Sequence, residues 1–82
     1  MARHEVVSPI PGTFYRRPEP TADPFVSEGQ AVTAGDTVCL VEVMKNFHPV
    51  LAGADGTVVE FLVEDEDVVG PGQAVAVIED GT

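Results

Sequence analysis

Basic residues are scarce in this chain of 82 residues, and tryptophan is absent. Four Lys and Arg stand against fourteen Asp and Glu, which gives a formal net charge of −10. Such a chain offers no basic patch to neutralise phosphates, so nucleic-acid binding is excluded. Lysine occurs once, as Lys45, between two strand-like runs. A single primary amine in that place calls for an explanation.

Disulfides and membrane spans are also excluded. The one cysteine, Cys39, has no internal partner, and its place inside an apolar run predicts a small buried side chain rather than a reactive thiol. The first ten residues lack the apolar core of a signal peptide, and no apolar run has a membrane-spanning length. We therefore expect one domain, residues 1–82, in the cytoplasm and away from membranes.

Short β-branched runs make up the rest of the chain, and Gly, Pro and Asp separate them. This pattern is typical of an all-β domain of about eight short strands, because helical periodicity is nearly absent. The expected strands are 4–8, 12–16, 24–27, 37–43, 47–52, 57–63, 68–69 and 74–79.

The two halves of the chain resemble one another. Residues 26–42 align with residues 63–79 at a constant offset of 37, whereas Gly12-Thr13 aligns with Gly56-Thr57 at an offset of 44. The first half therefore holds seven extra residues, which we place within 16–23. Two similar halves of about four strands predict a sandwich or flattened barrel with pseudo-two-fold symmetry.

The duplication also places Lys45. Glu42 aligns with Glu79, so the residues after Glu42 correspond to the end of the chain and form the connection between the halves. We expect Met44 and Lys45 to form the tip of a two-residue hairpin. Neither is a preferred residue of such turns, which indicates a choice made for chemistry.

Three segments, "SPIPGTFYRRPEP", "GDTVCLVEVMK" and "GTVVEFLVE", are similar to the biotinyl domain of the biotin carboxyl carrier proteins of acetyl-CoA carboxylase. The most specific piece, residues 42–45 (Glu-Val-Met-Lys), resembles the family's E-A-M-K-M motif, in which the lysine carries biotin through an amide bond. The resemblance implies two four-stranded antiparallel sheets with quasi-dyad symmetry, and the biotinyl lysine in the hairpin that joins the halves.

The resemblance further implies a carrier without a catalytic residue of its own. Biotin protein ligase would attach biotin to Lys45. A biotin carboxylase would then load the group, and a carboxyltransferase would unload it onto an acyl-CoA, giving malonyl-CoA from acetyl-CoA. Residues expected at the hairpin and in ligase recognition are Glu42, Val43, Met44 and Asn46.

The extra residues of the first half resemble the protruding thumb of bacterial and plastid carriers, which folds towards the biotin. The thumb residues expected beside the cofactor are Arg17, Pro18, Glu19 and Pro20. Six positions depart from the family pattern. Val43 replaces Ala, Asn46 replaces Met, and Arg17 stands where a small hydroxyl residue is expected. Phe47, His48 and Pro49 differ from the polar stretch that is common after the motif. Pro49 cannot donate a ladder hydrogen bond, which predicts an edge or irregular strand there.

Two other interpretations stay open at this point. A lipoyl domain has a similar duplicated topology and an exposed lysine, but it typically carries an acidic residue where this chain has Met44, and it has no thumb. An unmodified binding module of the same fold would carry no cofactor.

Other sites are weak in this sequence. His4 and His48 have no ligand spacing to each other or to Cys39, so no metal site is expected. The acidic run at 64–67 lacks the spacing of a calcium loop. Glu66 stands where the first half has Gly29, so a positive φ there would cost some stability.

Overall fold

A computed structural model describes residues 2–19 and 21–80 of the chain. Its described residues form eight β-strands and no helix, so none of them belongs to a helix able to cross a membrane. The strands are β1 (Arg3–Val7), β2 (Gly12–Tyr15), β3 (Ala31–Val32), β4 (Thr37–Val43), β5 (Asn46–Leu51), β6 (Gly56–Phe61), β7 (Val68–Val69) and β8 (Ala74–Glu79).

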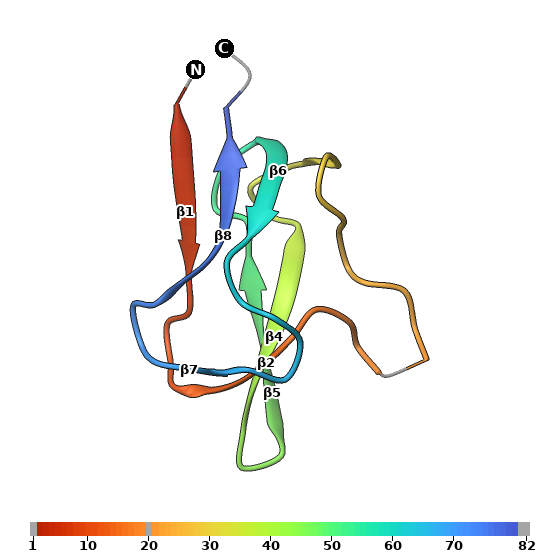
Figure 1. Cartoon of the computed structure of the whole chain (residues 1–82), viewed down its shortest axis with the longest axis vertical. Helices are drawn as coiled ribbons and strands as arrows, with labels where there is room; N and C mark the ends of the chain where they lie inside the picture. Colours follow the sequence, from red (N-terminus) through yellow and green to blue (C-terminus); the bar gives the residue numbers. More distant parts are fainter. Residues whose placement is uncertain (1, 20, 81–82) are drawn as a thin grey trace.

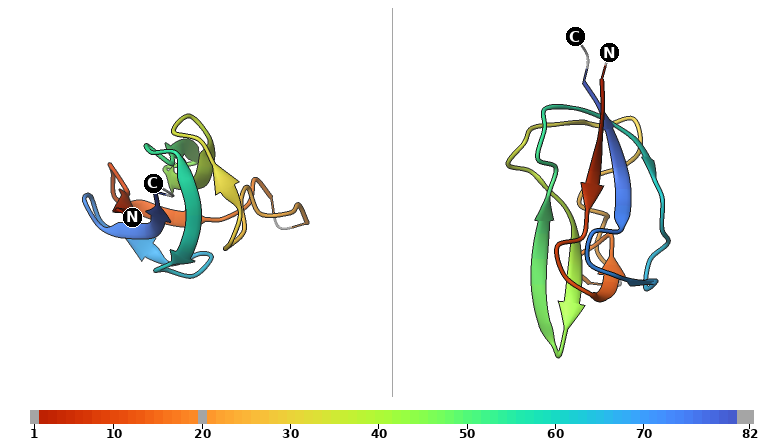
Figure 2. Two further views of the ribbon diagram at one scale, coloured as in Figure 1. Left: turned by 90° about the horizontal axis from the view of Figure 1, so that it is seen from above. Right: turned by 90° about the vertical axis from the view of Figure 1, so that its left-hand side faces the viewer.

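The strands form two four-stranded sheets, with the orders β1-β8-β6-β3 and β5-β4-β2-β7. Every pair of neighbours runs antiparallel. The two sheets lie face to face, with both termini at one end and the β4–β5 hairpin at the other (Figures 1 and 2). The predicted fold class, an all-β sandwich of two such sheets, is confirmed.

The core between the sheets consists mostly of valine. Alternate side chains of the strands point inward, as expected for half-buried strands, and Phe14 is the largest fully buried one. The Phe14 ring meets Phe61 edge-on, with ring centroids 6.2 Å apart. Branched aliphatic residues therefore fill a thin core that has room for few aromatic rings. The buried valines are Val6, Val26, Val32, Val38, Val41, Val50, Val58, Val69 and Val75.

The pseudo-two-fold symmetry extends to strand order and to individual hydrogen bonds. Exchanging β1 with β5, β8 with β4, β6 with β2 and β3 with β7 converts one sheet into the other. The backbone N–H of Phe14 donates to the Asp67 carbonyl, and at the offsets of 44 and 37 the N–H of Val58 donates to the Gln30 carbonyl. The duplication read from the sequence is therefore a duplication of the structure.

The predicted strand at 24–27 is wrong, and the third strand is Ala31–Val32 instead. The apolar signal of 24–27 comes from a loop: Val26 is buried, and Phe25 donates its N–H to the carbonyl of Arg16 at the end of β2. Pro24 has no N–H to give to a ladder. The offset of 37 from β7 leads to 31–32, so the repeat located this strand better than the local pattern did.

Two glycines allow the sheets to close. A Cβ on Gly12 would collide with the carbonyl oxygen of Glu42, and a Cβ on its counterpart Gly56 would collide with that of Glu79. Both neighbours are backbone atoms of a central strand, so they cannot move aside without breaking the ladder. Glycine is required at both places because the backbones approach closely there.

Replacing Gly12 by Ala should therefore lower the free energy of unfolding by about 1–3 kcal/mol, the usual cost of overpacking. Chemical denaturation followed by circular dichroism measures this change. Gly35→Ala is the matched control, because a Cβ at Gly35 meets no atom within 4 Å. Equal stability of the two variants would contradict the close approach at Gly12.

Candidate functional site

The β4–β5 hairpin places Met44 and Lys45 at its apex. Val43 pairs with Asn46 as the last rung of the ladder, and the two residues between them form the turn. Their φ angles are 51° for Met44 and 67° for Lys45. The predicted hairpin tip is thus confirmed, and the hairpin extends beyond the rest of the domain at the end opposite the termini (Figure 1).

This turn is strained for the residues it contains. A two-residue hairpin of type I′ needs φ > 0 at both central positions, which is why Asn-Gly is favoured there. A left-handed conformation costs a residue other than Gly about 1–2 kcal/mol, and Met44 recovers little of this by burial, since 89% of it is exposed. The long β4–β5 ladder supplies the stability that holds the turn. The geometry agrees with a turn sequence selected for chemistry.

The Lys45 side chain is exposed at this apex. The two ion pairs found among the described residues join Arg3 to Glu79 and Arg17 to Asp65, so neither holds the lysine. An exposed amine on a rigid hairpin can reach the active site of another protein and attack an activated acyl group.

Glu42 and its neighbours form a small cluster just below the apex. The Tyr15 hydroxyl donates to Oε1 of Glu42 at 3.3 Å, and Phe47, the direct cross-strand partner of Glu42, places its ring centroid 6.1 Å from that of Tyr15. Desolvation raises the pKa of Tyr15 above its ordinary value of 10.0, and the negative charge of Glu42 adds to this effect. Tyr15 therefore stays a hydrogen-bond donor that ties β2 to the base of the hairpin.

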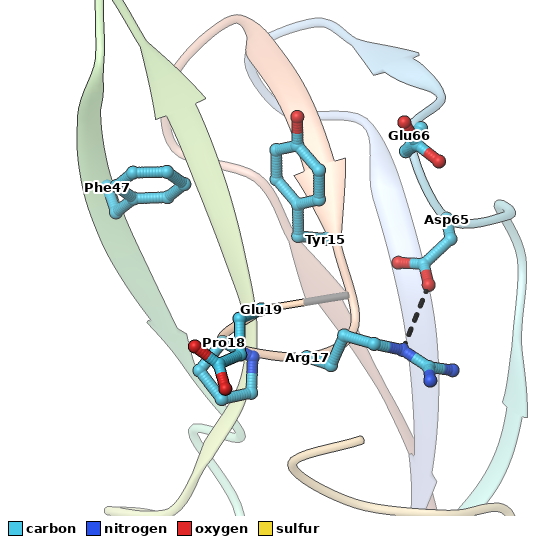
Figure 3. A pocket seen from close by; sticks show the side chains of 7 residues that line it. All are labelled: Tyr15, Arg17, Pro18, Glu19, Phe47, Asp65 and Glu66. Carbon is cyan, nitrogen blue, oxygen red and sulfur yellow. Dashed lines mark ion pairs between the residues drawn. The ribbon is translucent and has the colours of Figure 1, made fainter. Parts of the chain in front are cut away.

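A cleft of about 470 Å³ lies beside this cluster, between the predicted thumb and the turn at 64–67 (Figure 3). The structure brings the predicted thumb residues Arg17, Pro18 and Glu19 to it, whereas Pro20 lies outside the described residues. The other lining residues were not predicted from the sequence. Phe47 could have been found, because a hairpin with Met44 and Lys45 as its turn pairs Phe47 with Glu42. These additional residues are Tyr15, Phe47, Asp65 and Glu66.

Arg17 is already engaged by the domain itself. Its Nε lies 3.3 Å from Oδ2 of Asp65, and its Nη1 donates to the carbonyl of Ala22. Oδ1 of Asp65 accepts the backbone N–H of Arg16 at 2.7 Å, and the Arg16 guanidinium stacks 4.0 Å from the centroid of Phe61. Asp65 thus fixes the start of the loop that follows β2, where the thumb is predicted. Figure 3 shows the Arg17 side chain directed to Asp65, away from the Tyr15 and Phe47 rings.

Glu66 adopts the left-handed conformation that the repeat indicated. Its φ is 71°, while its counterpart Gly29 has a φ of 89°. The Glu66 N–H donates to the carbonyl of Phe14, as the Gly29 N–H donates to that of Val58. The hydrogen bond requires the same backbone in both halves, and only the first half meets it with glycine.

Cys39 is a core residue. It is fully buried, and its counterpart in the second half is the equally buried Ala76. Burial raises the pKa of the Cys39 thiol from its ordinary 9.0 to about 12. The expectation of a small buried side chain is confirmed.

Comparison with known proteins gives a consistent result. A sequence model described as "Biotin-requiring enzyme" matches residues 4–78. The chain is 42% identical to the biotin carboxyl carrier protein of acetyl-CoA carboxylase of Pyropia yezoensis, covering 90% of this chain and 47% of that protein. It is also 42% identical to the protein of that name from Haemophilus influenzae, covering 96% of this chain and 51% of the relative. The chain thus spans about half the length of these relatives.

Solved structures share the fold. The urea carboxylase of Kluyveromyces lactis contains a matching part with a TM-score of 0.80 and 32% identity, covering 96% of this chain and 6% of that one. A single-chain, multi-domain long-chain acyl-CoA carboxylase matches with a TM-score of 0.79 and 25% identity, covering 98% of this chain and 7% of the other. In both, the matching part is a small piece of a much longer chain.

Glu66→Gly should raise the free energy of unfolding by about 1 kcal/mol relative to Glu66→Ala, because both variants remove the carboxylate but only glycine relieves the left-handed strain. Denaturant titration of the two variants gives the difference directly. A less stable glycine variant would mean that the strain at this position is negligible.

The Cys39 thiol should resist iodoacetamide at pH 8 in the folded domain and react readily once the chain is unfolded. A pKa near 12 instead of 9.0 leaves about a thousandfold less thiolate. Mass spectrometry of timed samples, with and without guanidinium, follows the reaction. Equal rates in the two conditions would contradict the burial.

Proposed function

The chain belongs to the family of biotin-requiring enzymes, and from that premise we propose that it is the carboxyl-carrier domain of a biotin-dependent acyl-CoA carboxylase, with biotin attached to Lys45. The observation that carries the proposal is the position of Lys45, the only lysine, exposed at the apex of a strained hairpin. The names of the relatives support the same carrier role.

The residues at the apex fit the attachment of biotin. In its neutral form, Nζ of Lys45 attacks the acyl carbon of an activated biotinyl adenylate, an amide bond forms, adenylate leaves, and the nitrogen loses a proton. Biotin protein ligase supplies the activated group, so no base beside Lys45 is needed. When bound, biotin supplies a ureido ring that accepts and releases carboxylate.

The domain then acts as a rigid base for a mobile arm. The β4–β5 ladder holds the apex away from the sandwich. The hydrogen bond from the Tyr15 hydroxyl to Glu42 connects the base of this hairpin to β2. We assign no catalytic step to this chain. Carrying the reacting group between two active sites makes each transfer nearly intramolecular, which raises the effective concentration.

We propose three protein partners. Biotin protein ligase modifies Lys45, a biotin carboxylase loads the arm, and a carboxyltransferase unloads it. The proposed acceptor is acetyl-CoA, giving malonyl-CoA, because the relatives from Pyropia yezoensis and Haemophilus influenzae are named for acetyl-CoA carboxylase. The structural neighbours are a urea carboxylase and a long-chain acyl-CoA carboxylase, so they support a role in carboxylation but do not indicate acetyl-CoA as the acceptor.

Lys45→Arg should abolish biotin incorporation and leave the thermal unfolding of the domain unchanged, because the side chain is exposed and Arg cannot form the amide. The experiment expresses the wild type and the variant with biotin and a biotin protein ligase, and measures the intact mass of each. The wild type should gain one biotinyl group.

Two results would contradict the proposal. A wild type that stays unmodified would favour a binding module without a cofactor, and a wild type that gains a lipoyl group instead would favour a lipoyl domain. Peptide mapping of the modified wild type provides the control, since the label should lie on the peptide that contains Lys45.

A further inference from the structure

The outer face of the sheet that carries the hairpin has an unusual surface. Directly paired residues of antiparallel strands point to the same side. The first row below the apex runs Phe47, Glu42, Thr13 and Val68, and the second runs Pro49, Leu40 and Tyr15. We call these two rows the hairpin face. Apart from Glu42 and Thr13, they consist of apolar and aromatic residues.

The duplication provides an internal comparison for the hairpin face. Each of its residues has a counterpart on the outer face of the other sheet, found by the offsets of 37 and 44 or, across the bulge in β6, by the strand pairing. Four positions differ between the two faces, and at three of them a charged residue of the other sheet is replaced by an apolar or aromatic one. In each pair that follows, the first residue belongs to the other sheet and the second is its counterpart on the hairpin face. The pairs are Arg3 and Phe47, Glu5 and Pro49, Glu60 and Tyr15, and Ala31 and Val68.

The fold itself does not require an apolar hairpin face. The other sheet has the equivalent strand order, with a bulge in β6, and there Arg3, Glu5 and Glu60 occupy the positions of Phe47, Pro49 and Tyr15. Arg3 pairs with Glu79, the counterpart of Glu42.

On the hairpin face, 54% of Phe47 and 81% of Val68 remain exposed. Val7, Leu51 and Leu62 are exposed elsewhere on the domain. The apolar residues of the hairpin face differ from them in lying in two neighbouring rows, and such a patch is typical of a surface for another protein.

Acidic residues border the hairpin face. Glu19 and Glu66 line the adjoining cleft, and in the described part of the chain neither has a cation within 4 Å, whereas Asp65 is paired with Arg17. A second copy of a chain with a net charge of −10 would be repelled from such a surface. The partner that fits carries an apolar patch with Lys or Arg at its rim.

The length of the lysine side chain selects one partner. Nζ of Lys45 stands on only four methylene groups, so the enzyme that acylates it has to bring its active site to the apex itself. Partners that meet the biotinylated lysine gain the length of the cofactor arm and can stay further away. The first two rows below the apex therefore lie within reach of the acylating enzyme, and their apolar character distinguishes them from the corresponding rows of the other sheet.

We propose that the hairpin face is the docking surface for biotin protein ligase, which covers Phe47, Tyr15 and Val68 with an apolar patch and places basic residues against Glu19 and Glu66. The inference rests on the proposed biotinylation of Lys45. It adds that recognition extends beyond the turn, across the outer face of β5, β4, β2 and β7.

The test uses Phe47→Glu and Val68→Glu, with Val7→Glu and Ala31→Glu as matched controls on the other face. Val7 and Ala31 are exposed, and Ala31 is the counterpart of Val68. The glutamate introduced in these variants adds negative charge, which should attract the basic residues at the rim of the ligase. Weaker binding of Phe47→Glu or Val68→Glu would therefore come from the lost apolar contact and not from lost charge complementarity. The kcat and KM of biotin incorporation by purified biotin protein ligase are measured by intact mass, and thermal unfolding checks the fold of each variant.

Each hairpin-face variant should raise KM about tenfold or more while kcat changes little, because a contact at the centre of an interface is lost but the lysine is intact. The controls should stay within about twofold of the wild type. The dissociation constant of ligase for Lys45→Arg should rise by the same factor when Phe47→Glu or Val68→Glu is added, a readout independent of turnover.

Wild-type biotinylation with unchanged KM in both hairpin-face variants would overturn the docking surface and leave the proposed function standing. Equal losses in the controls would overturn it as well, because the effect would then be one of charge alone. A wild type that the ligase does not modify would overturn the proposed function and this inference together. If Phe47→Glu fails to fold, Val68→Glu decides, since that side chain is almost free of contacts.

Discussion

The left-handed backbone at Met44 and Lys45 is the constraint on which the site depends. Two consecutive residues with positive φ are unfavourable for side chains of this kind, and they exist only because the Val43–Asn46 rung and the ladder behind it close the turn. In return, the turn brings an amine to the extreme end of the molecule on a short, stiff support. The same two residues in an open loop would be less strained, but they would hold the amine in many orientations.

The duplicated architecture explains why this turn lies at one end of the sandwich. It also allows the two ends of the sandwich, and the outer faces of the two sheets, to be compared. One end of the pseudo-dyad is the continuous β4–β5 connection, and the other is formed by β8 and β1, next to the chain ends (Figure 1). The core and the glycine crossings obey the symmetry. The outer faces do not: one carries charges, and the other carries Phe47, Tyr15 and Val68 near the lysine. Folding accounts for the shared features, and the proposed recognition by biotin protein ligase would account for the difference.

Much of this structure could be predicted from the sequence, since each correct inference depended on a local signal or on the repeat. Apolar runs and the Gly, Pro and Asp residues between them indicated seven of the eight strands. The repeat indicated the hairpin apex, and the alignment of Glu66 with Gly29 indicated a positive φ. The third strand failed because a buried loop residue, Val26, resembles a strand residue when it is read locally. The ion pair of Arg17 with Asp65 could not be predicted, since it joins a loop to a turn 48 positions away through side-chain geometry alone. The attachment of biotin to Lys45 stays a prediction, as do the roles towards biotin of the other expected site residues, Glu42, Val43, Met44, Asn46, Arg17, Pro18, Glu19 and Pro20.

Central to the proposed function is that the folded hairpin, rather than the local sequence, makes Lys45 an acceptor of biotin. The most direct test compares the initial rate of biotin incorporation into the folded domain with the rate for a linear peptide of residues 40–49 under the same ligase. The free peptide lacks the strands that hold Met44 and Lys45 at positive φ. We therefore expect the ligase to modify the domain readily and the peptide hardly at all. Equal rates for the two substrates would contradict it.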